Sequence, residues 1–202
     1  MLKDKQIIKE AIRNLKVQTR RKELKKKERV DKFWVLKIIL ISFVVAFLFA
    51  VISELVIPNA NIVVGLILLI VFILLGILFD MIGVAVTSAD EKPFHSMASR
   101  KVRGADIAVT FKKNADKVSS FCNDVIGDIC GVVSGSVGVI IATSLSDNMN
   151  VNPVLMSLVV TALIAAITIG GKAIGKSFAI NKNNIILYEF AKTISYFYKK
   201  RK

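Results

Sequence analysis

The sequence predicts an all-α membrane protein with four transmembrane helices and basic amphipathic helices beside the membrane. Its 202 residues are 54% hydrophobic with a mean hydropathy of +0.60, too apolar for an ordinary soluble domain of this size. The apolar residues form long blocks without strand alternation, and a helical span needs about 20 residues. Lys and Arg number 29 against 15 Asp and Glu, and they gather between the blocks.

Residues 1–32 are predicted to be a basic cytoplasmic arm. Ile8, Ile12 and Leu15 recur at helical spacing, which favours an amphipathic helix on a lipid surface. The run RRKELKKKER that follows is too charged to enter lipid. No small-residue cleavage site follows it, so the arm is not a typical signal peptide.

Four apolar blocks are predicted to span the membrane: 33–57, 61–88, 118–145 and 154–174. The first is an added transmembrane helix, and Phe33 and Trp34 at its start suit the membrane interface. The other three form one core domain, 61–175. Within it, the polar segment 90–117 predicts a short amphipathic helix or helix pair. The tail, 176–202, predicts an amphipathic juxtamembrane helix that ends in KKRK.

The distribution of Lys and Arg predicts the orientation. The arm, the segment 90–117 and the tail are basic, whereas the links at Pro58 and at 146–153 contain no Lys or Arg. The positive-inside rule therefore places both termini in the cytoplasm, in a plasma (inner) membrane whose inner leaflet is anionic. No aromatic-interleaved basic platform indicates nucleic-acid binding. No nucleophile–base pair, phosphate loop or metal-hydrolase spacing indicates an enzyme.

Acidic residues inside the apolar blocks are the strongest functional signal. Asp80 lies in the second block, and Asp124 and Asp128 lie in the third, beside Asn123. A carboxylate at membrane depth costs at least about 2.5 kcal/mol, so each should face protein, a partner charge, an ion or water. Asp124 and Asp128 are four residues apart and are predicted to share a helix face. With Lys172, these groups are expected to meet in a pocket that opens toward the cytoplasm.

Other polar or small residues have plainer interpretations. Gly127, Gly131 and Gly135 repeat at four-residue spacing, which lets another helix approach closely. Cys122 and Cys130 are interpreted as small packing residues, and the single histidine, His95, as a surface or packing residue. The sequence has no Cys/His cluster that would predict a zinc site.

Three runs in the second half resemble the transmembrane domain of the CorC and cyclin-M (CNNM) magnesium transporters. The run FDMIGVAVTSADEKPFHSMASRKVRGADIA resembles the end of that family's first helix and the basic segment after it. The run KVSSFCNDVIGDICG resembles its second helix, which carries a G-N-N motif. The run GGKAIGKSFAINKNNIILYEFAKTI resembles the exit of its third helix, G-E-x-x-P-K-x-x-A-x-R-N. Order and spacing both fit, over about residues 78–202.

The resemblance implies a homodimer, here through the faces of Gly127, Gly131 and Gly135, with three core helices and an inward-facing acidic cavity. It also implies a Mg²⁺ ion held by side-chain oxygens. The candidate ligands in this chain are Asp80, Ser88, Asn123, Asp124 and Asp128. The chain departs from the family because it has no counterpart of the cytoplasmic CBS domains. It also has Lys172 at the position of a family glutamate and Gly175 at that of a proline.

Two main hypotheses follow. The first is a magnesium-type divalent-cation transporter that uses the candidate ligands above. The second is a non-transporting membrane scaffold or regulatory subunit, in which Lys172 pairs with Asp124 or Asp128 and locks the cavity. An ammonium group repels a cation by about 4 kcal/mol per unit-charge pair at 4 Å and an effective dielectric of 20, which favours the second. A proton- or sodium-coupled carrier that uses the same carboxylates is a third, smaller alternative.

Overall fold

The computed structural model describes residues 32–56 and 62–197. The predicted basic arm, the turn at Pro58 and the KKRK end therefore lie outside the described residues. Within them all regular structure is helical, which confirms the predicted all-α class. The helices in chain order are α2 (Lys32–Val56), α3 (Ile62–Ser88), α4 (Glu91–Ser99), α5 (Ala105–Lys113), α6 (Ala115–Ser120), the π-helix η1 (Phe121–Gly127), α7 (Asp128–Met149), α8 (Pro153–Asn181) and α9 (Asn183–Phe197).

The chain divides into two compact units, Met1–Leu40 and Ile41–Lys202. Of the first, the structure describes residues 32–40, which begin α2. The second holds the rest of α2 and every later helix, and all of the packing contacts described below belong to it.

Four helical segments in the described residues are long and apolar enough to cross a membrane, as predicted. They are Phe33–Ser53, Ile62–Ser88, Ala115–Met149 and Pro153–Asn181. The last two are longer than the predicted 118–145 and 154–174. The cause is that hydropathy marks only the part of a helix that lipid would cover. A helix continues past that point wherever no residue breaks it, and α8 runs on through Lys172, Gly175 and Lys176.

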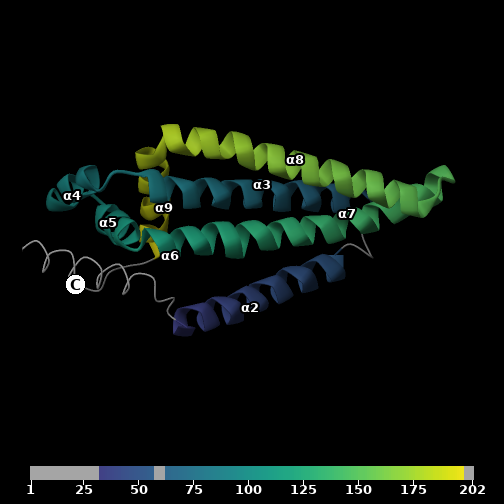
Figure 1. Ribbon diagram of the computed structural model, residues 1–202, viewed down its shortest axis with the longest axis horizontal. Helices are drawn as coiled ribbons and strands as arrows, with labels where there is room; N and C mark the ends of the chain where they lie inside the picture. The colour runs from purple at the N-terminus through teal and green to yellow at the C-terminus, as the bar shows by residue number, and fades with distance from the viewer. Residues whose placement is uncertain (1–31, 57–61, 198–202) are drawn as a thin grey trace, which may run out of the picture. The chain divides into compact units, whose positions relative to one another are not determined.

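Helices α3, α7 and α8 run side by side and form the core bundle of the second unit (Figure 1). Small residues lie where they touch. A methyl group at Gly76 would be 3.2 Å from the Cβ of Cys130, and one at Gly138 would overlap the Ile164 side chain. Close backbone approach of this kind is typical of membrane helices.

The three glycines of the predicted face are not equivalent. Gly127 is buried near the Gly76 carbonyl, whereas a methyl group at Gly131 or Gly135 would meet nothing within 4 Å. Four residues exceed one turn of about 3.6 residues, so each step rotates the position by roughly 40° around the helix. The predicted homodimer contact through this face stays a prediction.

A tight turn reverses the chain between α7 and α8. Asn150 takes a left-handed conformation with φ 53°, which asparagine tolerates better than most residues. The Asn152 side-chain oxygen then accepts a hydrogen bond of 2.9 Å from the Val154 amide and so caps α8. Pro153 is the first residue of the helix, where its missing amide hydrogen costs nothing.

At the opposite end of the bundle, the end of α3 packs with α4, α5 and α9 around an apolar cluster, which we call the end cluster. Its buried members are Val86, Ala89, Phe94, Ala108, Val109, Leu187 and Ala191. Lys112 Nζ donates to the Thr87 carbonyl at 2.7 Å, and Asn183 Nδ2 donates to the Ser88 carbonyl at 2.9 Å. The last carbonyls of α3 are thereby satisfied. Helices α4 and α5 are the helix pair predicted for residues 90–117.

Helix α9 lies very close to the start of α5. Gly104 has a φ of 85°, and a methyl group there would lie 2.8 Å from the Cα of Lys192. Both the left-handed conformation and the contact with rigid backbone therefore require glycine. The predicted amphipathic tail helix is α9, and it buries Leu187 and Ala191.

Candidate functional site

Five polar side chains come from α3, η1, α7 and α8, near the end of the bundle that adjoins the end cluster. We call this set the polar layer: Asp80, Asn123, Asp128, Lys172 and Lys176. Two ion pairs run from α8, one to α3 and one to α7, and Asn123 packs on α3. The layer therefore joins all three helices of the core.

Asp80 is the buried acid of the layer. Its side chain is 5% exposed, and its Oδ2 atom lies 3.6 Å from Lys176 Nζ. That separation exceeds the 2.7–2.9 Å typical of charge-assisted hydrogen bonds, and Oδ2 has no hydrogen-bond partner among the described residues. A buried carboxylate oxygen without a hydrogen bond is costly, so this atom has unused capacity to hold a cation.

Asn123 supplies a second buried oxygen. Its Nδ2 donates to Ser119 Oγ at 3.4 Å, while its Oδ1 is buried and has no hydrogen-bond partner in the described part of the chain. The carboxamide packs directly on Gly83, where a methyl group would overlap Oδ1. Because Gly83 follows Asp80 by one helical turn, the two unsatisfied oxygens belong to adjoining turns of the α3–η1 contact.

The backbone around Asn123 is a π-helix, Phe121–Gly127, inserted between α6 and α7. Wider π turns are rare, and they occur frequently at functional sites because they change the direction of side chains and backbone carbonyls. This segment was predicted to be ordinary α-helix. The apolar pattern gave no sign of the insertion, since a change of one residue in the hydrogen-bond register barely alters the hydropathy.

Lys172 and Asp128 form the second ion pair. Lys172 Nζ lies 3.3 Å from Asp128 Oδ1 and donates to the Gly127 carbonyl, also at 3.3 Å. The lysine side chain is 18% exposed and the aspartate side chain is 70% exposed. Lys172 is therefore held by two acceptors in a mostly buried position, and its partner carboxylate faces outward.

The remaining candidate ligands are exposed, unlike the two buried oxygens of Asp80 and Asn123. Asp124 is exposed, and Ser88 is exposed at the end of α3, about 12 Å of helix rise beyond Asp80. Within residues 32–56 and 62–197, no three Asp, Glu, His or Cys side chains gather in a way that could hold a metal. The expected convergence of Asp80, Asp124 and Asp128 does not occur, because Asp124 and Asp128 point out of the bundle while Asp80 points into it.

Helix length places the polar layer relative to lipid. Asp80 follows Ile62 by roughly 27 Å of helix rise, and Lys172 follows Pro153 by roughly 28 Å, at about 1.5 Å per residue. The hydrocarbon core of a bilayer is about 30 Å thick. If the α7–α8 turn lies at one boundary, the layer lies at the other. Its exposed members, Asp128 and Lys176, can then reach the headgroups and water.

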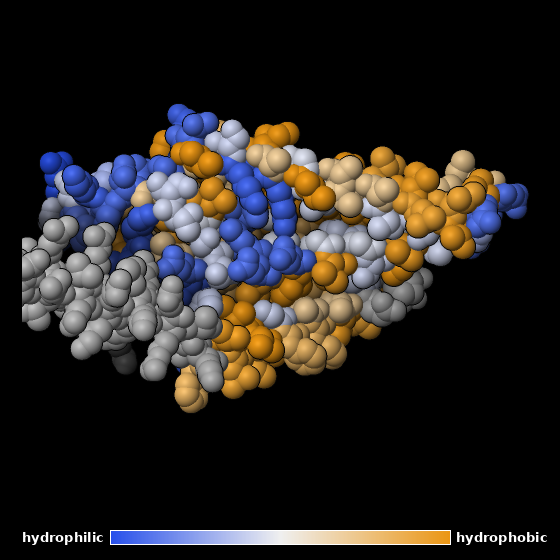
Figure 2. Space-filling model, in the orientation of Figure 1, coloured by the Kyte–Doolittle hydropathy of each residue, from blue (hydrophilic) through white to orange (hydrophobic). Residues whose placement is uncertain are grey.

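The surface agrees with this placement. On the face seen in Figure 2, α7 and α8 are hydrophobic toward their shared turn and become hydrophilic toward the end of α8 that adjoins α9. Lys176, with its side chain 50% exposed, lies in this end of α8. The polar layer therefore reaches the molecular surface on its α8 side.

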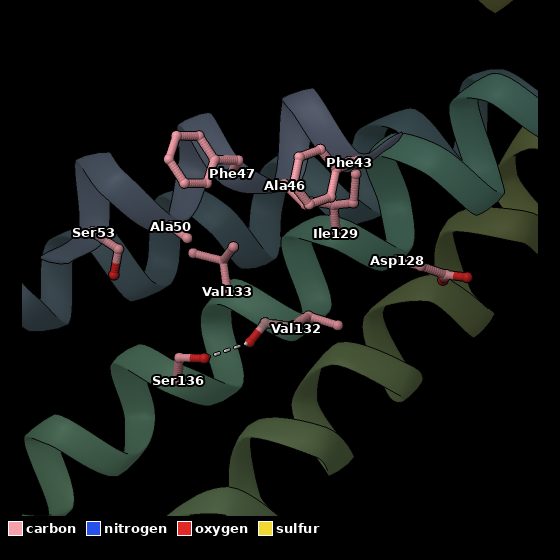
Figure 3. A pocket seen from close by; sticks show the side chains of 10 residues that line it. All are labelled: Phe43, Ala46, Phe47, Ala50, Ser53, Asp128, Ile129, Val132, Val133 and Ser136. Atoms are coloured by element: carbon pink, nitrogen blue, oxygen red, sulfur yellow. Dashed lines mark hydrogen bonds between the residues drawn. The ribbon is translucent and has the colours of Figure 1, made fainter. Parts of the chain in front are cut away.

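A separate groove lined by α2 and α7 is not a comparable site. Its walls are mostly apolar and include Phe43, Phe47, Ile129 and Val133, with Asp128 at one end (Figure 3). The Ser136 hydroxyl on its wall is already bonded to the Val132 carbonyl at 3.2 Å. The groove offers no cluster of free oxygens that could hold a cation.

Sequence reasoning missed Lys176. It lies four residues after Lys172 on one helix, so the two lysines share a face, and this spacing was the available signal. His95 is exposed as predicted, and its Nε2 contacts Glu91 Oε1 at 2.9 Å. This hydrogen bond is the largest effect on Glu91 and lowers the pKa of that carboxyl.

No protein-family model matches the chain, and no curated protein matches it in a sequence search.

Proposed function

We propose that this chain is an integral membrane protein that binds and carries a magnesium-type divalent cation, with Asp80 and Asn123 as its buried ligands. One observation supports the proposal above the others. Two side-chain oxygens, Asp80 Oδ2 and Asn123 Oδ1, are buried on adjoining turns without a hydrogen bond. A cation with its bound waters is a partner that both oxygens could share.

The donor set suits this class of ion. Carboxylate, amide and hydroxyl oxygens are the hard ligands that Mg²⁺ prefers. Mg²⁺ is commonly bound by only one or two carboxylates, and it keeps several of its waters. A site with Asp80, Asn123 and access to water from the α8 side therefore meets its needs without the three-carboxylate cluster that we expected. Mg²⁺ would be the cargo of the protein.

The membrane topology supports a route for such an ion. The polar layer lies at the end of the bundle that carries α4, α5 and α9, and by helix length it would lie at one boundary of the hydrocarbon if the α7–α8 turn lies at the other. The basic composition of these helices predicts that this end is cytoplasmic, in a plasma membrane with an anionic inner leaflet. The site would then take its ion from the cytoplasm or release it there.

The test is the thermal unfolding of the full chain in lipid nanodiscs, with MgCl₂ titrated against choline chloride at equal ionic strength. We expect Mg²⁺ to raise the Tm of the unmodified protein and of Asp124→Asn, the matched control. Asp80→Asn should show no Mg²⁺-dependent change, and a liposome flux assay with a magnesium dye should show lost transport. The absence of any response to millimolar Mg²⁺, both in the unmodified protein and in a variant without the Lys176 charge, would contradict the proposal.

A second candidate function has its own supporting observation. The pair between Lys172 and Asp128, at 3.3 Å, is the type of lock expected of a non-transporting scaffold or regulatory subunit. In that case both ion pairs only hold α8 to its neighbours. The chain would show no response to Mg²⁺ or Na⁺, and both lysines would matter only for stability.

A further inference from the structure

We propose that Lys176 is a tethered counter-cation that occupies the Asp80 site and must be displaced before a diffusible cation can bind. This inference rests on the proposed cation site and adds its regulation. It assigns different roles to the two lysines of α8, which are four residues apart and carry the same charge.

The contacts of Lys176 are those of a displaceable group. Its Nζ atom lies 3.6 Å from Asp80 Oδ2, beyond hydrogen-bond distance, and no other acceptor of the described residues holds it. Its side chain is 50% exposed. A lysine side chain has a flexible stem of four carbons. Rotation about its bonds can therefore carry Nζ from the carboxylate to water without moving α8.

Lys172 is fixed by contrast. It is 18% exposed and bonded to both the Gly127 carbonyl and the Asp128 carboxylate, each at 3.3 Å. Moving it would break both contacts and would require a mostly buried ammonium group to find a new path to water. Lys172 therefore stays in place while Lys176 exchanges.

Charge arithmetic explains why the exchange matters. Within the layer, the two negative charges of Asp80 and Asp128 are balanced by the two positive charges of Lys172 and Lys176, so a divalent ion that entered beside both lysines would find no net negative charge to hold it. If Lys176 swings out, one negative charge is left at Asp80, beside the Asn123 oxygen. Binding of a cation therefore competes with Lys176, which sets the concentration at which the site fills.

The experiment compares MgCl₂ titrations of thermal unfolding for the full chain and for Lys176→Gln, in nanodiscs of zwitterionic lipid at constant ionic strength. Lys172→Gln is the matched control. We expect Lys176→Gln to respond at a Mg²⁺ concentration at least tenfold lower than the unmodified protein. Lys172→Gln should change that midpoint less than about threefold, because Lys172 does not occupy the site. Lys176→Met, which keeps the length without the charge, provides a second variant should Lys176→Gln fail to fold.

The outcomes separate the two proposals. If the unmodified protein and Lys176→Gln respond at the same concentration, Lys176 is no competitor, although the cation site itself stands. If neither responds, both the site and its regulation are wrong. If only Lys176→Gln responds, and Asp80→Asn in that background abolishes the response, the competition is supported and the resting site is closed at the concentrations tested.

Discussion

The two ion pairs of the polar layer differ in which member is buried, the acid or the lysine. In one, a buried acid, Asp80, meets a half-exposed lysine, Lys176; in the other, a mostly buried lysine, Lys172, meets an exposed acid, Asp128. The free-energy cost of an ion pair falls on the member that has lost its water. In the first pair, the buried Asp80 depends on Lys176 for its stabilisation. In the second, the mostly buried Lys172 is stabilised by the Gly127 carbonyl as well as by Asp128.

This difference corrects a prediction made from the sequence. One hypothesis from the sequence paired Lys172 with Asp124 or Asp128 as the lock of a buried cavity, and the pair with Asp128 is present, at 3.3 Å. Asp128 is exposed, however, and the buried aspartate is Asp80, whose partner is Lys176. We therefore expect substitution of Lys176 to destabilise the protein more than substitution of Lys172.

Lys176→Ala should have the largest effect. It leaves Asp80 buried without a counter-charge, and we expect a loss of about 3 kcal/mol in the free energy of unfolding without added cation. That value is at the low end of the range for buried pairs, because Lys176 is half exposed. Reversible unfolding in mixed micelles measures it, with the exposed Lys117→Ala as control. A loss equal to that of the control would contradict the role of Asp80 as a buried, charged group.

Gly83→Ala tests the neighbouring Asn123. The added methyl group would overlap the Asn123 carboxamide, whereas the same change at Gly131 meets nothing within 4 Å. Both substitutions gain the same helix propensity, so their difference isolates the steric effect. We expect Gly83→Ala to be about 2 kcal/mol less stable than Gly131→Ala in the same unfolding assay. Equal stabilities would mean that Asn123 turns away from α3 without cost.

Lys172→Ala should cost less than about 1 kcal/mol, because the side chain of its partner, Asp128, is 70% exposed. The same assay measures it beside Lys176→Ala. If Lys172→Ala is the more destabilising of the two, Asp128 must be covered in the membrane. The contrast between a buried Asp80 and an exposed Asp128 would then be wrong.

Breaking the exposed pair of Glu91 and His95 should have the smallest effect on stability, and this pair serves as an exposed reference for the two pairs of the polar layer. The hydrogen bond from His95 lowers the pKa of Glu91 below 4.5, so its contribution is present above that value and is lost as the pH falls through the lowered pKa. His95→Ala should return the pKa of Glu91 toward 4.5 in an NMR titration, with no measurable change in Tm. A marked change in Tm would show that the pair is less exposed than described.

The sequence predicted the features that depend on long stretches of residues. Four apolar blocks suffice for four spanning helices, and the helical spacing of Leu187 and Ala191 suffices for the amphipathic α9. The polar layer was predicted only in part. Asp80, Asn123, Asp128 and Lys172 were all singled out, yet their directions depend on the π-helix and on which neighbours cover each face. Neither can be read from periodicity.

Helix α3 is unbroken from Ile62 to Ser88 and carries both Asp80 and part of the end cluster. It therefore works as one rigid rod, with Asp80 about two thirds of the way along it and the end cluster at its tip. Because no break in the helix separates Asp80 from the end cluster, a protein bound at the end cluster would be mechanically connected to the polar layer.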